Sequence, residues 1–356
     1  MLNNKHTPYK PEFIDKGKLQ DFLNNHSTVT MVDAFERQLK ELFFIDNNQF
    51  IGLPKEDVYK SQEFSEYANK KANDYIYIYY PWNGHIVKCV NADDYYRLKT
   101  NRNQDLITAQ EQKRLYNYRV AVLGMSVGSN IAFVLTQSGV SKKIYLSDFD
   151  ELDTTNLNRI LAGVHQIGLN KTIVAARRIY EDNPYADVNI FTEGINSKNL
   201  ESLLNNKEID CIVEEIDNLP MKIEVRKLAL KYKVPVVMVT DNGDGVVLSV
   251  ERYDLGYDKI FHEMPEYWGD KLTGKIDKQS VSKIIIENII GGADKVDPKM
   301  MASVKRVLNK ELVSWSQLGS AAILGGVIAT FAIKKIILKE TTQLNVREYI
   351  LPPKLL

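Results

Sequence analysis

From Arg119 onward, short apolar runs alternate with longer segments in which apolar residues recur every three or four positions. The short runs are rich in β-branched residues, as buried strands are, and the longer segments have the period of amphipathic helices. Five strands are predicted, at residues 119–124, 143–148, 188–193, 210–215 and 234–240, with helices at 129–138, 171–182, 197–204 and 220–232. This alternation predicts an α/β fold, with a mainly parallel sheet and helices on both of its faces.

The first hundred residues follow another pattern, in which polar and aromatic residues predominate. An amphipathic helix is predicted at 31–44, strands at 74–80 and 85–90 around a turn at 81–84, and a charged helical connector at 100–117. We therefore predict two parts, a small α+β module at residues 1–100 and the α/β domain at 101–356. The module is the expected source of substrate selectivity.

The longest apolar stretch runs from Leu318 to Ile333. It is shorter than a bilayer span and is interrupted by small residues, so it predicts a buried, close-packed helix rather than a membrane anchor. Gly325 and Gly326 allow close contact between helices, within the chain or across a dimer.

Composition narrows the classes of partner. The 46 lysine and arginine residues equal the 46 aspartate and glutamate residues, so no overall charge favours nucleic acid or an acidic membrane. Cys89 and Cys211 lie far apart in strand-like runs, which argues against disulfides and structural zinc and predicts buried structural thiols. The N-terminus shows no signal-peptide pattern, and we expect a cytoplasmic protein without a membrane or nucleic-acid partner.

Candidate chemistry begins where the first predicted strand ends. Gly124, Ser126, Gly128 and Ser129 lie in a turn that leads into a helix. Glycine permits the backbone to approach a phosphate, and the free N–H groups at the start of a helix attract negative charge. The turn departs from the G-x-G-x-x-G pattern at both serines, so a turn that needs glycine only for its geometry stays an open alternative.

The second predicted strand ends in Asp148-Phe149-Asp150, where a carboxylate can accept both hydroxyls of a nucleotide ribose. We expect Asp148 to be that ribose ligand, with Asp150 beside it. Asn156 and Arg159 follow within a few residues, and Lys171 precedes the next helix. Adenylyl transfer needs such cations because negative charge builds on the phosphate oxygens as the bond to pyrophosphate breaks.

Together these segments resemble the ThiF/MoeB-type family of ubiquitin-activating-like adenylating enzymes. The resemblance is carried by residues 124–159, from GMSVG to NLNR, by GLNK at 168–171 and by DCIVEEIDN at 210–218, in the family's order. The C-terminal glycine-rich helix is similar to the family's closing helix. The resemblance implies a Rossmann-like domain that binds ATP and Mg²⁺ and adenylates a carboxylate, giving an acyl-adenylate and pyrophosphate.

The resemblance also implies residue roles. Asp148 would bind ribose, Asn156, Arg159 and Lys171 would hold the triphosphate, and Asp217, next to Asn218, would position Mg²⁺. Family members commonly receive an arginine from the partner subunit, and Arg102 lies at about the right distance upstream to be that residue. A homodimer, or a pseudo-dimer with a related subunit, is therefore expected.

The chain departs from the family pattern in three ways. Ser126 and Ser129 stand where the family has glycines, which leaves nucleotide binding intact but can shift its specificity. The paired cysteines of the family's frequent zinc site are missing. No cysteine follows the ATP site in a mobile segment, so the reaction is expected to end at the acyl-adenylate, whose acyl group passes to a separate nucleophile.

The acid itself stays open between a ubiquitin-like carrier, a ribosomally made peptide and a small carboxylic acid. The tyrosine-rich strand at 74–80 can accept a peptide by edge pairing, although core packing is the commoner role of such a strand. YYPWNG at 79–84 is similar to a bacterial branch of the family whose members can carry a nitroreductase-like domain, so a redox or transferase partner acting in trans is conceivable.

Three other functions remain as alternatives. An NAD-dependent oxidoreductase would explain Gly124, Gly128 and Asp148 but leaves the downstream cations without a role. A sensor or scaffold would bind nucleotide without turnover. An α/β-hydrolase would use Gly-x-Ser-x-Gly as a nucleophile elbow, with His165 or His262 as its base.

Overall fold

The computed structural model describes residues 7–262 and 284–351. These residues form two compact units, one covering Pro8–Ala109 and the other running from Gln110 toward the C-terminus. Arg102, which belongs to the predicted ATP-binding part at 101–356, therefore lies in the N-terminal unit. Each unit has its own sheet and its own buried apolar residues.

The larger unit is built on a seven-stranded sheet in the order β11-β10-β9-β8-β5-β6-β7. Its strands are β5 (Val120–Leu123), β6 (Lys143–Ser147), β7 (Asp187–Phe191), β8 (Cys211–Glu214), β9 (Val236–Asn242), β10 (Gly245–Glu251) and β11 (Asn345–Ile350). The strands β9, β8, β5, β6 and β7 are parallel to one another, and β10 and β11 are antiparallel to their neighbours. The prediction of a mainly parallel sheet is confirmed, whereas β10 and β11 were not predicted.

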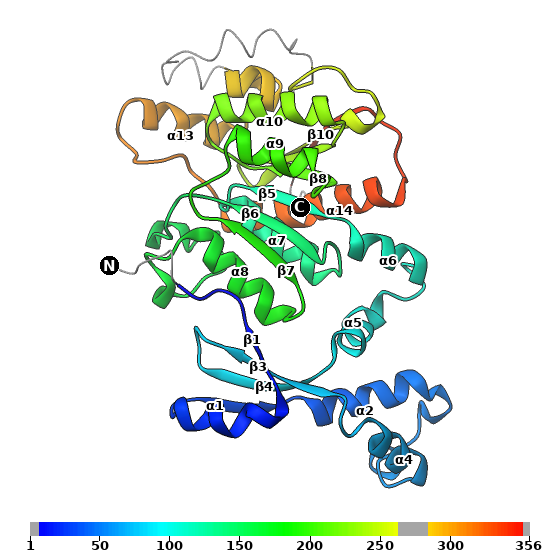
Figure 1. The fold of residues 1–356 in the computed structure, drawn as a ribbon. Coiled ribbons are helices and arrows are strands. Elements are labelled where there is room, and N and C mark those ends of the chain that lie inside the picture. The colour runs from blue at the N-terminus through cyan, green and yellow to red at the C-terminus, as the bar shows by residue number, and fades with distance from the viewer. Residues whose placement is uncertain (1–6, 263–283, 352–356) are drawn as a thin grey trace. The chain divides into compact units, whose positions relative to one another are not determined.

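Helices cover both faces of this sheet, as predicted (Figure 1). The helices are α6 (Ala109–Asn117), α7 (Val127–Gln137), α8 (Lys171–Asp182), α9 (Ser197–Asn205), α10 (Leu219–Tyr232), α13 (Pro298–Leu308) and α14 (Gly319–Leu338). α9 and α10 pack together on one face, and α7, α8 and α14 lie on the other. Crossovers of this kind bring the carboxyl ends of the parallel strands to one edge of the sheet, where ligands bind in such folds.

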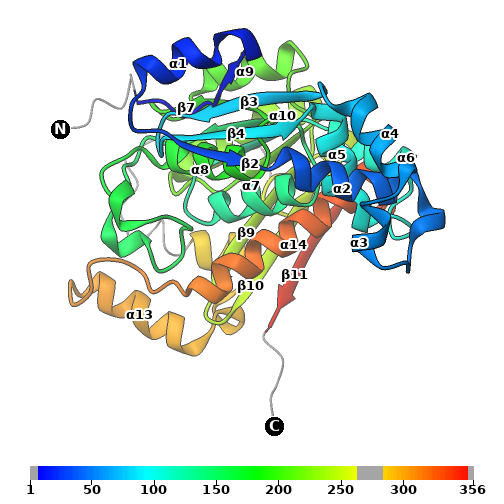
Figure 2. The ribbon, with the colours of Figure 1, turned by 90° about the horizontal axis from the view of Figure 1, so that it is seen from below.

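The apolar stretch at 318–333 forms α14, which lies beside α7 and across β9 and β10 (Figure 2). By length and composition α14 is the one helix of the described residues that can cross a membrane. The small residues of α14 from Ala321 to Ala332 are buried, and a Cβ at Gly326 would stand 3.0 Å from the Asn130 backbone, so glycine permits the close contact with α7. The prediction of a close-packed helix is confirmed.

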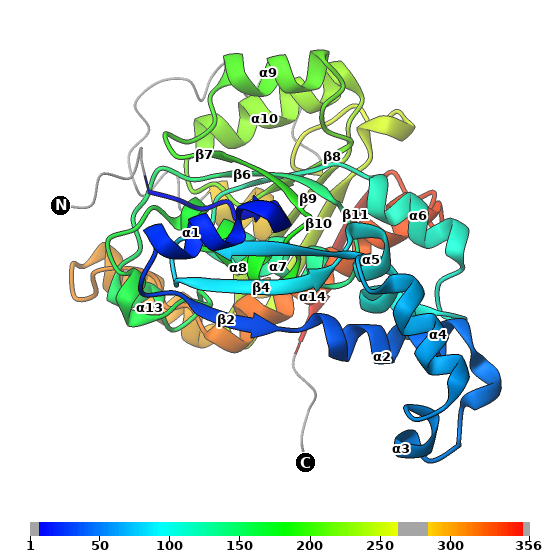
Figure 3. The same cartoon turned by 60° about the horizontal axis from the view of Figure 1, so that its bottom comes forward.

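The N-terminal unit has a four-stranded sheet in the order β1-β3-β4-β2 (Figure 3). Its strands are β1 (Glu12–Ile14), β2 (Thr30–Asp33), β3 (Tyr75–Tyr80) and β4 (His85–Val90), and its helices are α1 (Leu19–Asn25), α2 (Phe35–Asp46), α3 (Lys55–Val58), α4 (Gln62–Lys71) and α5 (Ala92–Thr100). The β3–β4 hairpin confirms the two strands predicted around the turn at 81–84. Cys89, on β4, is buried as expected.

Two predictions for this part of the chain were wrong in detail, and one alternative is excluded. The helix predicted at 31–44 begins only at Phe35, because Thr30–Asp33 pairs with β4 and the Asp33 carboxylate accepts the Phe35 N–H at 3.0 Å. The helix predicted at 100–117 is interrupted before α6, where Asp105 has a φ of 69°. The tyrosine-rich β3 lies between β1 and β4, so it has no free edge for a peptide.

Candidate active site

The turn after β5 is fixed by the close approach of two strand ends. Gly124 has a φ of 96°, and a Cβ there would lie 2.3 Å from the Glu215 carbonyl oxygen. A Cβ at Gly128 would lie 2.9 Å from a methyl group of Val122. Both glycines are therefore required by chain packing, and the same geometry leaves the N-terminus of α7 without a side-chain cap at Ser126. That helix start can receive an anion.

Asp148 lies directly beyond β6 and faces this turn. Its carboxylate accepts the Met125 N–H at 2.6 Å and the Asp150 N–H at 2.8 Å. Burial raises the pKa of Asp148, while the two backbone N–H groups and the nearby Lys171 oppose that rise. The carboxylate predicted to bind ribose thus joins the ends of β5 and β6, and each oxygen keeps a lone pair for a further donor.

Lys171 is the first residue of α8 and is 8% exposed. Its ammonium group pairs with the Asp150 carboxylate at 2.7 Å, and its backbone N–H donates to the Asp150 carbonyl at 2.9 Å. Asp150 and Lys171, each predicted to bind the nucleotide, are therefore joined to each other in an ion pair. A lysine at a helix N-terminus is disfavoured by the helix dipole, so the carboxylate offsets that cost.

Arg159 is half-buried and is held by three hydrogen bonds. Its Nε donates to Ser126 Oγ at 2.9 Å, and its Nη1 donates to the Thr155 carbonyl at 3.2 Å and to Asn158 Oδ1 at 3.0 Å. The serine that replaces a family glycine thus orients the predicted phosphate-binding arginine. Within the described residues Nη2 has no acceptor, which leaves it available to a ligand.

The other residues predicted for the site also make local contacts that stabilise the fold. Asn156 is buried and caps a short helical turn by accepting the Asp153 N–H at 3.0 Å. Asn218 caps α10 by accepting the Met221 N–H at 2.9 Å, and Ser129 Oγ donates to the Ser126 carbonyl at 2.9 Å. Asp217, between β8 and α10, is exposed and close enough to Arg159 to stabilise its charge.

The structure brings most of the predicted site together in the larger unit. The turn at 124–129, Asp148, Lys171, Arg159 and Asp217 all lie at or next to the carboxyl ends of β5, β6 and β8. Arg102 lies in the N-terminal unit, where its side chain is exposed on a short turn after α5. Its predicted role across a dimer stays a prediction.

Sequence reasoning missed Asp241, near the end of β9. Val213 on β8 and Val237 on β9 lie opposite each other in the sheet. Asp217 comes four residues after Val213, and Asp241 comes four residues after Val237. Asp241 is 5% exposed, accepts from Gln317 Nε2 at 3.3 Å, and has a buried Oδ1 without a hydrogen-bond partner. The sequence did carry a signal for Asp241, because it directly follows the apolar run at 234–240, just as Asp148 follows the apolar end of β6.

Asn170 was missed as well. It is buried in front of α8, where its Oδ1 accepts the Thr172 N–H at 2.9 Å. Its Nδ2 donates to the carbonyls of Asp148 and Thr192, at 3.1 and 3.2 Å, and so ties the ends of β6 and β7 together. An asparagine before a predicted helix is a common N-cap, and that signal identifies it.

Asp241 makes the stability of the fold depend on pH. Burial raises its pKa from 3.8 to about 6, although Arg159 and Gln317 favour the charged form. Because the folded pKa lies above the unfolded one, this group stabilises the fold at pH below 4 and loses that contribution as pH rises through 6. A shift of this size corresponds to about 3 kcal/mol at neutral pH.

We therefore expect Asp241→Asn to raise the free energy of unfolding at pH 8, by about 1–3 kcal/mol, and to change it little at pH 4. Urea denaturation of both proteins at the two pH values measures this. Asp244→Asn, at an exposed position in the following turn, is the matched control. An equal effect of Asp241→Asn at both pH values would show that the pKa of the Asp241 carboxyl group is the same in the folded and the unfolded protein.

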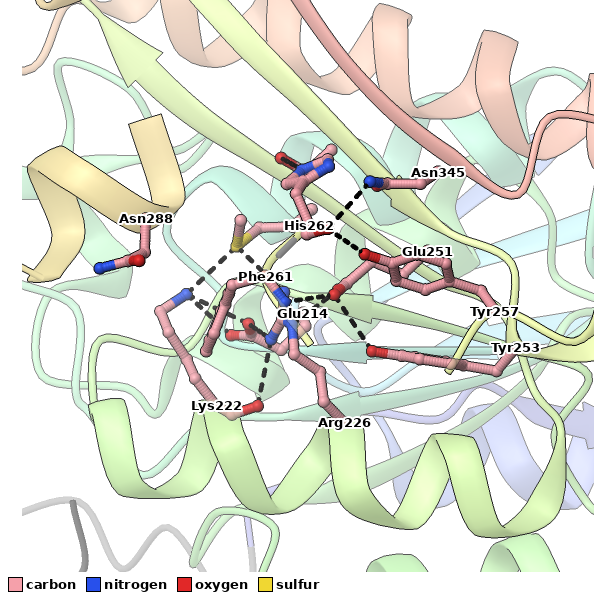
Figure 4. Close-up of polar contacts among 12 residues, drawn as sticks. Glu214, Lys222, Arg226, Glu251, Tyr253, Tyr257, Phe261, His262, Asn288 and Asn345 are labelled. Atoms are coloured by element: carbon pink, nitrogen blue, oxygen red, sulfur yellow. Dashed lines mark hydrogen bonds and ion pairs between the residues drawn. The ribbon is translucent and has the colours of Figure 1, made fainter. Parts of the chain in front are cut away.

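A buried ionic network joins α10 to β8 and β10 (Figure 4). Arg226 is fully buried and pairs with Glu214 at 2.7 Å and with Glu251 at 2.6 Å. Lys222 pairs with Glu214 at 3.0 Å. Burial acts against the charge of Glu214, yet these two cations keep its pKa below the usual range.

The network is connected to the site through Glu214, because its Oε1 also accepts the Ile216 N–H at 2.8 Å. That bond fixes the chain one residue before Asp217. On the next residue along, Glu215 Oε1 accepts the Val239 N–H at 2.8 Å, and burial raises the pKa of Glu215 well above its usual range. Consecutive acidic residues thus hold the end of β8 from two sides.

The nucleophile-elbow alternative has no support in this geometry. Ser126 has a φ of −76° and bonds to Arg159 rather than to a histidine. His262 is buried beside Ser249 at 3.2 Å, and burial lowers its pKa to about 3. His165 is exposed in a separate turn. Among the described residues, no histidine contacts Ser126, so a serine hydrolase lacks its base.

The site thus combines a tight glycine turn, an aspartate at a strand end and two cations. Comparison of the sequence with known protein families points the same way. A model of the ThiF family matches residues 98–352. The chain belongs to the ThiF family. The resemblance seen in the sequence is thereby confirmed at the level of the family.

Two curated relatives and a solved structure extend this comparison. The chain is 33% identical over 322 residues to the uncharacterized protein MT1398 of Mycobacterium tuberculosis, covering 90% of this chain and 42% of that protein. It is 32% identical over 135 residues to a probable molybdopterin-synthase adenylyltransferase of Porphyra purpurea, covering 37% of this chain and 35% of that protein. The chain therefore spans less than half the length of either relative.

A crystal structure of the E. coli tRNA N6-threonylcarbamoyladenosine dehydratase, in complex with AMP, matches with a TM-score of 0.50 at 18% identity. The match covers 71% of this chain and all of that one. At this identity the similarity establishes the Rossmann-type ThiF fold alone.

Proposed function

We propose that this ThiF-family chain binds ATP beyond the carboxyl ends of β5, β6 and β8 and transfers the adenylyl group to a carboxylate. The observation that carries the proposal is the pair of enclosed cations. Arg159 is held by Ser126, and its Nη2 has no acceptor among the described residues; Lys171 is paired with Asp150, close enough to Asp148 to lower the pKa of that carboxylate. An oxidoreductase would leave both cations without a role. The AMP bound to the structurally similar dehydratase and the activity of the adenylyltransferase relative support the same proposal.

The chemistry follows from charge. A carboxylate is already ionised at neutral pH, so no general base is needed for its attack on the α-phosphorus of ATP. One carboxylate oxygen forms the new P–O bond, the bond to the β-phosphate oxygen breaks, and pyrophosphate leaves with that electron pair. Arg159 and Lys171 stabilise the negative charge that accumulates on the phosphate oxygens. The products are an acyl-adenylate and pyrophosphate.

Asp217 is the residue that would hold Mg²⁺. It is an exposed carboxylate at a strand end, and Mg²⁺ is commonly held by one or two carboxylates together with substrate phosphates. The described residues contain no preformed cluster of three or more metal-ligating side chains, which fits a cation that arrives with ATP. When bound, the cation would neutralise phosphate charge. Asp217 itself would anchor it relative to Arg159.

Calorimetry tests the proposal, with MgATP, metal-free ATP and NAD titrated into the full chain. We expect MgATP to bind in preference to NAD, and Asp217→Asn to weaken MgATP binding about tenfold or more while sparing metal-free ATP. Asp244→Asn serves as an exposed control. Preference for NAD would overturn the proposal in favour of redox chemistry.

Pyrophosphate exchange then separates an enzyme from a nucleotide sensor. Radiolabelled pyrophosphate should enter ATP only when a suitable acid is added. We propose that this acid is the C-terminus of a peptide or ubiquitin-like protein, or a small carboxylic acid. ATP binding without exchange across peptides and acids of all three classes would favour a sensor or scaffold.

A further inference from the structure

The N-terminal unit contains an open cavity of about 790 Å³. Its walls come from α2, the segment between α2 and α3, the start of α3, and the end of α5 with the turn that follows it (Figure 3). These residues lie between positions 41 and 104, so the cavity belongs to this unit, whereas the proposed ATP site is built from the larger one. Small-molecule sites typically measure about 300–1,000 Å³, and the cavity lies within that range.

Much of the lining is apolar. Phe44 and Ile45, on α2, and Leu98, on α5, are half-buried there. Ile51 and Leu53, between α2 and α3, also line the cavity and are 67% and 51% exposed. Exposed apolar side chains that gather around a groove, rather than standing singly, are typical of binding sites. The cavity therefore offers apolar contacts to a ligand.

Positive charge also gathers at this cavity. The charged residues that line it are Lys55, Lys99, Arg102 and Glu41, so cations outnumber acids by three to one. The dipole of α5 favours cations at its C-terminal end, which accounts for Lys99 and Arg102 but not for Lys55. The side chains of Lys55 and Arg102 are exposed and form no ion pair among the described residues. Both charges are therefore available to an anion.

A ligand that satisfies both features has an apolar body and a negatively charged group. Burial of an aliphatic chain against the apolar lining is favourable, and a carboxylate makes charge-assisted hydrogen bonds with an arginine. A folded protein matches less well, because specific protein interfaces use about 20–30 residues on each side, and thirteen residues line this cavity. A nucleotide matches less well too, because most of its surface is polar.

We propose that this cavity binds an aliphatic carboxylate of medium chain length. The chain packs against Phe44, Ile51 and Leu98, and the carboxylate pairs with Arg102, while Lys55 adds positive charge at the same cavity. Because the cavity is separate from the proposed adenylation site, the inference stands whether or not the chain transfers an adenylyl group.

Three probes test this proposal by calorimetry on the full chain, each kept below its micelle concentration. Decanoate carries both the aliphatic chain and the carboxylate. Decyltrimethylammonium carries a chain of the same length with a positive head group, and acetate carries the carboxylate without the chain. We expect decanoate to bind with one-to-one stoichiometry, at least about tenfold more tightly than either of the other probes.

Variants of the lining residues should remove this selectivity. Arg102→Glu and Lys55→Glu should each weaken decanoate binding by about fivefold or more while sparing decyltrimethylammonium, because only the carboxylate loses a counter-charge. Leu53→Ser should weaken both chain-bearing probes alike. Lys60→Glu, at an exposed lysine, and Leu106→Ser, at a leucine that is 88% exposed, are matched controls outside the cavity lining. Both should keep decanoate affinity within about twofold of the original protein.

A further variant keeps this inference apart from the proposed function. Lys171→Met should leave decanoate affinity unchanged, since Lys171 lies in the larger unit. If Lys171→Met abolishes decanoate binding and Leu53→Ser does not, the carboxylate occupies the adenylation site, which would overturn this inference and support the other proposal. Several decanoate molecules bound per chain, equal affinity for decyltrimethylammonium, or an equal loss in Leu106→Ser would show general adsorption to apolar surface and would overturn it as well.

Discussion

Lys171→Met should reduce MgATP affinity by about ten- to a hundredfold and adenylation by about a hundred- to a thousandfold. Lys171 is 8% exposed, and its ammonium group lies 2.7 Å from the Asp150 carboxylate. A phosphate oxygen would replace or share that partner, and methionine keeps the length of the side chain without its charge. Calorimetry with MgATP measures the first effect, and substrate-dependent pyrophosphate exchange measures the second.

Two variants control this experiment. Lys231→Met removes an exposed lysine that pairs with Glu201, and it should leave ATP affinity unchanged. Asp150→Asn removes the acid that competes with phosphate for Lys171, so it should maintain or increase affinity. A loss of affinity in this variant would show that Asp150 contacts the nucleotide. The free energy of unfolding should change little in Lys171→Met, because the Asp150 side chain is 52% exposed. MgATP affinity within twofold of the original protein would contradict a phosphate-binding role for Lys171.

Arg226→Met should lower the free energy of unfolding by about 3–5 kcal/mol. The guanidinium group is fully buried between Glu214 and Glu251 and stacks over the Phe261 ring at 4.0 Å. Methionine has a similar volume, so the main effect is two buried carboxylates that lose a counter-charge. Equilibrium denaturation in urea measures the change.

A double variant distinguishes charge from packing. Arg226→Met combined with Glu251→Gln should be more stable than Arg226→Met alone, because one uncompensated charge is removed with its partner. Arg178→Met, which lies on the exposed face of α8 and has a weak contact with Glu181, should change the free energy of unfolding by less than about 0.5 kcal/mol. A loss in Arg226→Met as small as in this control would show that the buried network is energetically neutral.

The strand-end residues could be predicted from the sequence because each strand has a strong local signal. Asp148 and Asp217 follow apolar runs that form β6 and β8, and α8 has the predicted bounds. Parallel order then places both carboxylates at one edge of the sheet. The family motifs identified the same positions.

The contacts between these residues could not be predicted, because they join distant parts of the chain. Ser126 and Arg159 are 33 positions apart, and nothing in the local pattern indicates their bond. Asp241 stands in Asp-Asn-Gly-Asp, which is typical of a turn, so its burial depends on α14 and on Gln317. Likewise, β2 became a strand because it pairs with β4, which overrides a local helical period.

The adjacent acids at the end of β8 also bear on how faithfully the sheet assembles. Glu214 meets Lys222 and Arg226, whereas Glu215 accepts the Val239 N–H in a setting that favours its neutral form. Neighbouring residues of a strand face opposite ways, so a slip of β8 by one position would move Glu214 into the surroundings of Glu215 and turn Val213 toward the cations. Lys222 would then lose its carboxylate partner, and Arg226 would lose one of its two. The misaligned sheet is thus penalised by buried charges that lack a counterion, which favours a single alignment during folding.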